Sequence, residues 1–169
     1  IGISLISFSL FWFFSVAFFL IPFFGGKDAS ILRQAGKFGF NLYFYGPIQN
    51  IPHRELISTA KKNGSDIVIT QNAKEAFDGA DLIVTDTWVS MHDISAKKKI
   101  SAIRPYQVDC KKMSYAKDDS IFLHCLPAHR GHEVVDEVID GKNSKVFDAA
   151  ENRMHVQKAI IKWVLNINF

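Results

Sequence analysis

Cysteine is scarce in this 169-residue chain, and the common nucleotide-binding loops are missing from it. The two cysteines, Cys110 and Cys125, cannot form a disulfide framework. They fit a reducing compartment, although a single bridge between them stays open. The sequence has no G-x-G-x-x-G fingerprint, no Walker A loop and no serine, histidine and aspartate in the usual neighbourhood of a hydrolase triad. These absences exclude a disulfide scaffold and leave nucleotide-binding and hydrolase functions with little support.

Charge is missing from residues 1–26, which hold eight of the fifteen phenylalanines. We therefore divide the chain into this apolar Phe-rich segment and a domain over 27–169. Three interpretations of the segment stay open. It is a membrane-spanning helix, since about 20 apolar residues cross ~30 Å of hydrocarbon, or a buried helix and strand of a larger protein, or a remnant that is not native coding sequence, such as a frame-shifted one. It lacks the basic start and the cleavage site of a signal peptide.

The overall composition is that of a folded domain. Hydrophobic residues make up 48% of the chain and charged residues 22%, which excludes a disordered chain. The net charge of +3 arises from basic and acidic residues that are mixed along the sequence, so we expect no nucleic-acid partner.

Short apolar runs alternate with helical patterns from residue 30 onward. Strands are predicted over 41–45, 66–70, 81–85 and 120–124, with 145–147 as a candidate fifth. Helices are predicted over 30–38, 50–62, 72–79, 97–103 and 107–113, with Asn50 and Asn72 as N-caps. A final helix begins near Asp148 and carries an apolar stripe of Val156, Ala159, Ile160, Trp163 and Val164. This order predicts an α/β fold, a three-layer Rossmann-like parallel sheet with helices on both faces, preceded by the apolar segment.

Ligands of such sheets bind at the carboxyl ends of the strands, which here means the residues after Thr85 and His124. Asp86 follows the first of these strands, and its carboxylate can hold a cationic amine. Backbone N–H groups around Ser90 and Met91 can bind a carboxylate, so this loop suits the head group of an amino acid. The alternative is that Asp86 is a turn or cap residue and Met91 fills the core.

Cys125 follows the other strand. A thiol there can meet a ligand, and the alternative is a small buried hydrophobe. His124, Cys125, His129 and His132 lie close together in sequence, but their spacing matches no common zinc pattern, so we predict no metal site.

Arg153, near the start of the last helix, is poorly placed for the helix dipole. It can serve an anion together with the exposed N–H groups at the start of that helix. The alternative is an ordinary surface arginine.

Together these motifs resemble ornithine carbamoyltransferase. They are Asp86-x-Trp-x-Ser-Met, His124-Cys-Leu-Pro-Ala-His-Arg-Gly131, and Phe147-Asp-x-Ala-Glu-Asn-Arg153 followed by His155-x-Gln-Lys158. The resemblance runs from about Ser30 to Val164 and concerns the carboxy-terminal, ornithine-binding domain of that family. The Ser-Met loop favours ornithine over the substrate of the aspartate-using relative.

The resemblance implies a role for each motif. Asp86 would hold the α-amino group of ornithine, and Ser90 and Met91 would line its amino-acid end. Cys125 would be the catalytic residue, lying with Leu126 between carbamoyl phosphate and the δ-amine. Arg153 would reach carbamoyl phosphate. It further implies a cytoplasmic enzyme of arginine metabolism that makes citrulline and phosphate without a metal or organic cofactor.

Two departures from the family pattern change what we expect of this chain alone. The Ser-Thr-Arg-Thr loop and the His-Pro-x-x-Gln segment of the family's amino-terminal domain are absent from the 169 residues. The family's Asp-Gly-Asn-Asn loop is replaced at 23–29 by FFGGKDA, and His92 stands where the family has glycine after methionine. We therefore expect no useful carbamoyl transfer by the isolated chain.

The family assembles as homotrimers mainly through the partner domains, so we do not expect a trimer of this chain alone. The alternative function, from another class, is a non-catalytic amino-acid-binding or interaction domain that residues 1–26 tether to a membrane.

Overall fold

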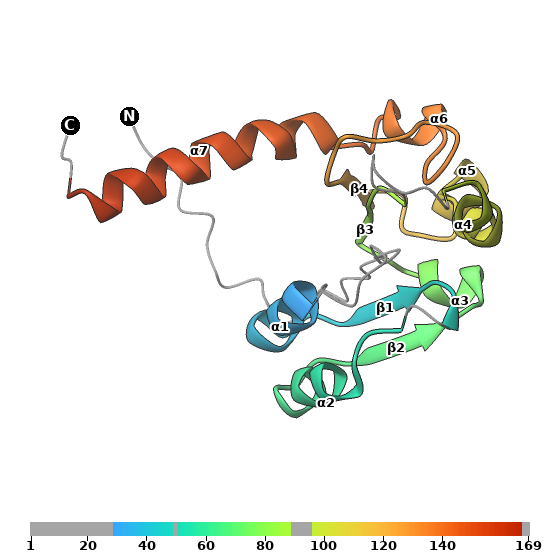
Figure 1. The fold of residues 1–169 in the computed structure, drawn as a ribbon, viewed down its shortest axis with the longest axis horizontal. Helices are drawn as coiled ribbons and strands as arrows, with labels where there is room; N and C mark the ends of the chain where they lie inside the picture. Colours follow the sequence, from blue (N-terminus) through green and yellow to red (C-terminus); the bar gives the residue numbers. More distant parts are fainter. Residues whose placement is uncertain (1–28, 49–50, 89–95, 167–169) are drawn as a thin grey trace.

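The computed structural model describes residues 29–48, 51–88 and 96–166 (Figure 1). Its strands are β1 (Leu42–Tyr45), β2 (Ile67–Thr70), β3 (Leu82–Thr85) and β4 (Ile121–His124). Its helices are α1 (Ala29–Phe38), α2 (Arg54–Lys62), α3 (Ala73–Phe77), α4 (Ala96–Ile103), the 3-10 helix η3 (Arg104–Tyr106), α5 (Cys110–Met113), α6 (Asp136–Ile139) and α7 (Val146–Val164). The apolar segment 1–26 lies outside the described residues, so its three interpretations and its boundary stay predictions.

Local signals explain several of these bounds. Gly39 adopts a φ of 71° directly after α1, a conformation that favours glycine and stops the helix. The side chain of Asn72 accepts hydrogen bonds from the backbone N–H groups of Lys74 and Glu75, which confirms the predicted N-cap of α3. Asp109 caps α5 in the same way, through the N–H of Lys112. The four main strand predictions are confirmed to within one residue.

Two helices begin several residues later than predicted. The predicted helix over 50–62 begins only at Arg54, where His53 is the N-cap residue, and Asn50 lies outside the described residues. The predicted helix over 107–113 is reduced to α5, because Val108 is buried and forms a parallel bridge with Val134 instead of joining a helix.

The candidate fifth strand over 145–147 is wrong, since α7 already begins at Val146. The chain pairs with β4 just before that point, in an isolated parallel bridge between Ser144 and Phe122. Val146 is buried, so its apolar side chain is part of the core, but it lies in the first turn of α7 and not in a strand.

The strands are parallel, as predicted, and they form two pairs. β1 pairs with β2, and β3 pairs with β4 with Thr85 opposite His124. Among the described residues β1 and β3 are not hydrogen-bonded to each other, so each of them keeps one edge without a strand partner. The α/β architecture is confirmed, and the structure adds that its sheet is split into halves.

Helices cover both faces of the β1–β2 pair. Leu42 and Ile67 pack with Leu32 of α1 and Ala60 of α2 on one face. Successive strand residues point to opposite faces, and Tyr45 packs against α3 on the other face. The larger cluster around Phe77, Ile83 and Phe122 continues from there toward β4 and α6. The core therefore reaches from α3 to the strand that precedes the candidate site.

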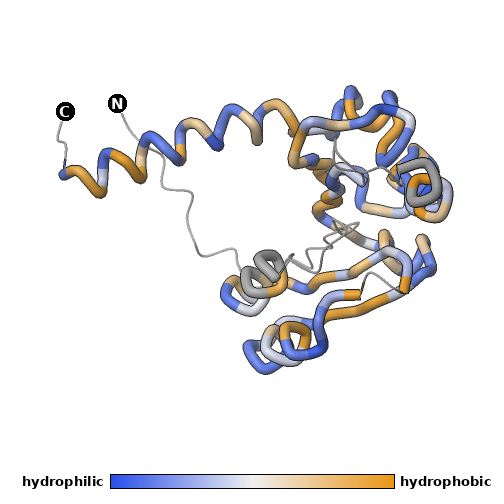
Figure 2. The backbone as a smooth tube through the Cα atoms, viewed as in Figure 1, coloured by the Kyte–Doolittle hydropathy of each residue, from blue (hydrophilic) through white to orange (hydrophobic). Residues whose placement is uncertain are grey.

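Helix α7 extends away from the other described elements (Figure 1). Apolar residues alternate with polar ones along its length (Figure 2). Large apolar side chains along it are exposed, Trp163 by 79%; the others are Phe147, Met154, Val156, Ile160, Ile161 and Val164. The predicted stripe is present, but no described element packs against it.

Candidate functional site

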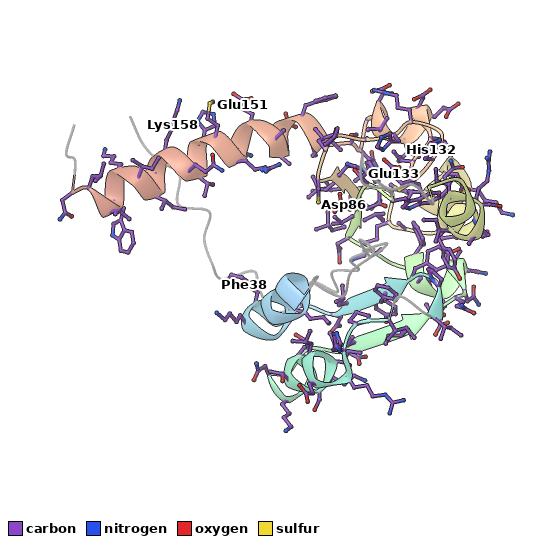
Figure 3. The ribbon with its side chains drawn as sticks, in the orientation of Figure 1. Phe38, Asp86, His132, Glu133, Glu151 and Lys158 are labelled. Atoms are coloured by element: carbon purple, nitrogen blue, oxygen red, sulfur yellow. The ribbon has the colours of Figure 1, made fainter. Side chains whose placement is uncertain are left out.

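The two strand ends chosen from the sequence lie side by side. Thr85 of β3 is opposite His124 of β4, so Asp86 and Cys125 follow at neighbouring positions of the same sheet edge. The hydroxyl of Thr87 donates a hydrogen bond of 2.6 Å to the carbonyl oxygen of Pro127, which joins the two loops. Figure 3 places Asp86 at this end of the molecule, together with Glu133. The sheet thus brings together two motifs that are about 40 residues apart in sequence.

Asp86 is half-buried, and its Oδ1 accepts a hydrogen bond of 2.7 Å from the N–H of Thr87. This is the turn role that the sequence left open for Asp86. Trp88 anchors the loop, since it is 2% exposed and packs with Ile103. Ser90 and Met91 lie outside the described residues, so their predicted contacts with an amino acid stay predictions.

Cys125 is exposed, and the alternative of a buried small hydrophobe is wrong. The single bridge between Cys125 and Cys110, which the sequence left open, is absent from the structure, where both cysteines are free. Arg153 of α7 is exposed and its Nη1 donates to the backbone oxygen of Cys125 at 3.3 Å. The first turns of α7 therefore carry the guanidinium to the end of β4, and the predicted role of Arg153 toward an anion stays a prediction.

Leu126 has a φ of 53°, in the left-handed region that residues with a side chain rarely adopt. Its N–H donates to Nδ1 of His124 at 2.8 Å. His124 is itself buried and faces Glu133, whose side chain is fully buried. Glu133 was not among the residues singled out from the sequence; the only signal for it was its place just after the HCLPAHRG segment.

Two further side chains fasten this segment. Gln107 donates from Nε2 to the backbone oxygens of Gly131 at 2.7 Å and His132 at 2.8 Å. Arg130 donates to Asp136 at 2.9 Å and to both carboxylate oxygens of Asp140. These hydrogen bonds from Arg130 hold the pKa of Asp140 below its ordinary value. Gln107 carries no mark in the sequence that would predict its contact with a loop 24 residues away.

Other motif residues of α7 lie elsewhere. Glu151 and Lys158 project from the side of α7 opposite to α1 (Figure 3). His155 Nε2 is 3.4 Å from Oε1 of Glu151, one turn earlier on the same helix.

Two hollows of the structure lie apart from the residues predicted at this sheet edge. A cavity of about 340 Å³ lies between α5 and α6, lined by Met113 and Val138 among others. A groove of about 610 Å³ runs along β3, β4 and the start of α7, past Leu82, Leu123 and Asn152. Neither has Asp86, Cys125 or Arg153 in its lining.

His129 and His132 stack with ring centroids 5.8 Å apart. In the described ranges no three His, Cys, Asp or Glu side chains gather as metal ligands would. Within those ranges there is also no helix of the length and apolarity that a bilayer crossing requires.

Comparison with known proteins identifies the origin of this arrangement. A sequence model of the family described as aspartate/ornithine carbamoyltransferase, Asp/Orn binding domain, matches residues 28–164. The ornithine carbamoyltransferase of Ruegeria pomeroyi is 52% identical over 139 residues, which cover 81% of this chain and 45% of that protein. The ornithine carbamoyltransferase of Rhodopseudomonas palustris is 50% identical over 137 residues, covering 81% of this chain and 44% of that protein.

Solved structures agree with these relatives. The ornithine carbamoyltransferase of Pyrococcus furiosus superposes with a TM-score of 0.77 at 34% identity, covering 88% of this chain and 49% of that one. The anabolic ornithine carbamoyltransferase of Campylobacter jejuni gives 0.78 at 32% identity, with coverage of 90% and 52%. The chain spans about half the length of the relatives that it matches. It belongs to the aspartate/ornithine carbamoyltransferase family, and the part of the family fold that it carries is the aspartate/ornithine-binding domain.

Proposed function

We propose that this chain supplies the ornithine-binding half of an ornithine carbamoyltransferase, an enzyme of arginine metabolism. In the reaction the neutral δ-amine of L-ornithine attacks the carbamoyl carbon of carbamoyl phosphate. A C–N bond forms, the C–O bond to phosphate breaks and the amine gives up a proton, so the products are L-citrulline and phosphate. The observation that carries this proposal is the convergence of Asp86, Cys125 and Arg153 on the end of the β3–β4 pair.

Each of these groups has chemistry that suits its proposed substrate. The carboxylate of Asp86 would bind the α-ammonium group of ornithine, and the loop with Ser90 and Met91 would receive its carboxylate. Cys125 and Leu126 would lie at the junction of the two substrates. The guanidinium of Arg153 would bind carbamoyl phosphate, since its fork of donors fits a phosphate. Rate acceleration in this scheme comes from positioning two substrates and from stabilising the charge that develops between them.

The second half of the site is proposed to come from a carbamoyl-phosphate-binding domain. Arg153 alone is a single exposed cation, whereas a dianionic phosphate is held by several donors. The Ser-Thr-Arg-Thr loop of the resembling family is not found in the 169 residues. The chain spans about half of its relatives, and the exposed apolar side chains of α7 offer an interface for the other half. We propose that the complete enzyme is cytoplasmic and that any trimer forms only with that half present.

The rival hypothesis, a membrane-tethered binding domain, is disfavoured by these comparisons. Residues 28–164 match a domain of an enzyme family, with relatives at about half identity that are named ornithine carbamoyltransferase. The proposed tether, 1–26, lies outside the described residues.

Reconstitution from two polypeptides tests the proposal. The purified chain is mixed with the amino-terminal half of the Ruegeria pomeroyi relative, and citrulline is measured after adding ornithine and carbamoyl phosphate. We expect no turnover by either piece alone and citrulline formation by the mixture. If the two pieces form a complex that makes no citrulline, the proposed function is wrong.

Arg153→Ala gives the matched test of the site. A hydrogen bond from a charged group is worth about 1.5–3 kcal/mol. The turnover of the mixture should therefore fall about 10- to 100-fold. Arg104→Ala is the control, because Arg104 is an exposed arginine of η3 that is not among the proposed substrate contacts. Equal turnover of the two variants would remove Arg153 from the site.

A further inference from the structure

Glu133 is a carboxylate with no solvent exposure. Acidic side chains are almost never fully buried unless they are paired, because an isolated charge in an apolar interior is costly. Glu133 lies in the turn between the HCLPAHRG segment and α6, and the proposed chemistry does not use it. Its burial also prevents it from touching a substrate. Its function must therefore be sought in the groups around it.

Those groups belong to the end of β4 and to the segment that follows it. Oε1 of Glu133 accepts a hydrogen bond from the backbone N–H of His129. The same oxygen is 3.3 Å from Nε2 of His124, whose side chain is fully buried as well. The ring of His129 is farther away, with Nδ1 at 3.9 Å, and is 43% exposed. Glu133 thus faces the last residue of β4 and a residue five positions later.

His124 transmits this contact to the loop. Its Nδ1 accepts the N–H of Leu126, so Nδ1 carries no proton and the neutral ring holds its proton on Nε2. That proton is on the side of Glu133. The alignment of Nε2 and Oε1 falls short of a good hydrogen bond, so the attraction is between a polar N–H and a close carboxylate. A carboxylate in this place favours the one tautomer that leaves Nδ1 free to accept.

Leu126 needs such a restraint. A residue with a side chain is strained in the left-handed region, and the surroundings must hold it there. His124 holds the N–H of Leu126, and Thr87 holds the carbonyl of Pro127, one residue later. With the N–H turned inward, the backbone oxygen of Cys125 meets Arg153. The position of Cys125 and Leu126 therefore depends on the tautomer of His124.

We propose that Glu133 is a positioning residue: it holds His124 as the Nε2–H tautomer, and His124 in turn holds the Cys125–Leu126 loop in the geometry needed for carbamoyl transfer. This inference rests on the proposed function for its kinetic consequence. Its structural part, the Glu133–His124–Leu126 relay, does not depend on any activity. The two parts are therefore tested separately.

The relay is tested on the full 169-residue chain by 15N NMR of labelled histidine. We expect the two ring nitrogens of His124 to show the Nε2–H tautomer at neutral pH. Glu133→Gln keeps an acceptor oxygen and should keep that signature. Glu133→Leu has a similar volume but no acceptor, and should lose the single tautomer. A wild-type His124 with its proton on Nδ1, or an unchanged spectrum in Glu133→Leu, overturns the proposal.

The two ring nitrogens can be tested one at a time. The side-chain amide of asparagine reaches the place of Nδ1, and that of glutamine reaches the place of Nε2. In the reconstituted mixture, His124→Asn can still accept the N–H of Leu126 and should keep more turnover than His124→Gln. The reverse order overturns the relay through Leu126.

Turnover in the same mixture separates positioning from packing. A buried charge replaced by an apolar residue of similar size is often neutral or stabilising. A packing role therefore predicts that Glu133→Leu is harmless. Positioning predicts that kcat falls about 100-fold in Glu133→Leu, the effect of displacing a reacting group by about 1 Å, with recovery in Glu133→Gln and little change in the KM for ornithine.

The exposed Glu137 of α6 supplies the control variant, Glu137→Gln, which should match wild type. Thermal melts identify any variant that fails to fold. If a Glu133 variant fails to fold, the comparison of His124→Asn with His124→Gln tests the relay instead. The proposed function and the relay can also fail separately. The function has failed and the relay stands if the wild-type mixture is inactive while two NMR results hold: wild-type His124 is the Nε2–H tautomer, and Glu133→Leu loses that single tautomer.

Discussion

The hydroxyl of Thr87 donates to the carbonyl oxygen of Pro127 at 2.6 Å, and this bond links the loop after β3 to the loop after β4. The two residues are 40 positions apart in sequence, so the bond is a product of the parallel pairing of β3 and β4. Both loops carry residues of the candidate site. Their mutual position is therefore fixed by one side chain in addition to the sheet.

Thr87→Val removes this bond and keeps the branched shape of the side chain. We expect a loss of about 1 kcal/mol in the free energy of unfolding, the typical net value of a hydrogen bond, because Thr87 is nearly buried. Urea unfolding measures it. Thr59→Val is the matched control, since Thr59 is exposed and donates to the backbone oxygen of Glu55 at 2.8 Å. A loss no larger at Thr87 than at Thr59 would contradict the proposed link.

Tyr45 makes the stability of the chain sensitive to alkaline pH. Burial, with smaller contributions from Tyr106 and Asp109, raises the pKa of Tyr45 to about 12. The folded state therefore disfavours the tyrosinate, and the stability due to neutral Tyr45 is present below pH ~10 and lost as the pH rises toward 12. Unfolding free energies measured from pH 9 to 12 should fall.

Tyr45→Phe keeps the ring, which packs edge-on against Tyr106 at 4.9 Å. It loses only the hydroxyl that donates to the oxygen of Pro105 at 3.3 Å. The decline above pH 10 should be smaller in this variant than in the wild type. An equal decline in both proteins would assign the alkaline sensitivity to other groups.

Asp109 is expected to matter at acidic pH. Burial acts to raise its pKa, but hydrogen bonds from the side chain and backbone of Lys112 outweigh this and lower the pKa below its ordinary value. A lowered pKa means that its stabilisation is present above pH ~4 and is lost as the pH falls further. Asp109→Ala should cost about 0.5–2 kcal/mol at pH 7, as the loss of an N-cap does.

Asp109→Asn separates the cap from the charge. Asparagine caps helices about as well as aspartate, so this variant should lose less stability than Asp109→Ala at pH 7 and should not change further with acid at this site. Unfolding by urea at pH 7 and pH 3 gives the comparison. A variant as unstable as Asp109→Ala would show that the ion pair with Lys112, at 2.8 Å, is the larger contribution.

The exposed apolar face of α7 is expected to bind the carbamoyl-phosphate-binding half. Ile160 is 53% exposed and no described element covers it. Ile160→Glu should therefore leave the unfolding free energy of the isolated chain within about 0.5 kcal/mol of wild type, as surface substitutions do. It should weaken assembly with the other half, measured by light scattering of the mixture. Lys162→Glu on the same helix controls for added negative charge. If Ile160→Glu and Lys162→Glu both assemble with the other half as strongly as the wild type does, the interface lies elsewhere.

The sequence alone was sufficient for the four main strands, for the existence of most helices and for the family. Strands such as 81–85 and 120–124 are short apolar runs bounded by polar residues, and such local patterns predict strands without knowledge of the long-range contacts. The motifs at Asp86, His124 and Arg153 pointed to the aspartate/ornithine-binding domain for a similar reason, because their order and separations are read directly from the chain. The residues that the structure adds, Gln107 and Glu133, carry no such local mark.

Other properties were decided by tertiary structure. The same apolar spacing that predicts a helix over α7 would suit a buried or an exposed face, and only the arrangement of the neighbouring elements leaves Trp163 in solvent. The burial of Glu133 beside His124 likewise depends on how the chain returns after β4. Local sequence encodes conformation through nearby atoms, whereas burial and the pairing of charges depend on which distant atoms exclude water, and that is settled only when the chain is folded.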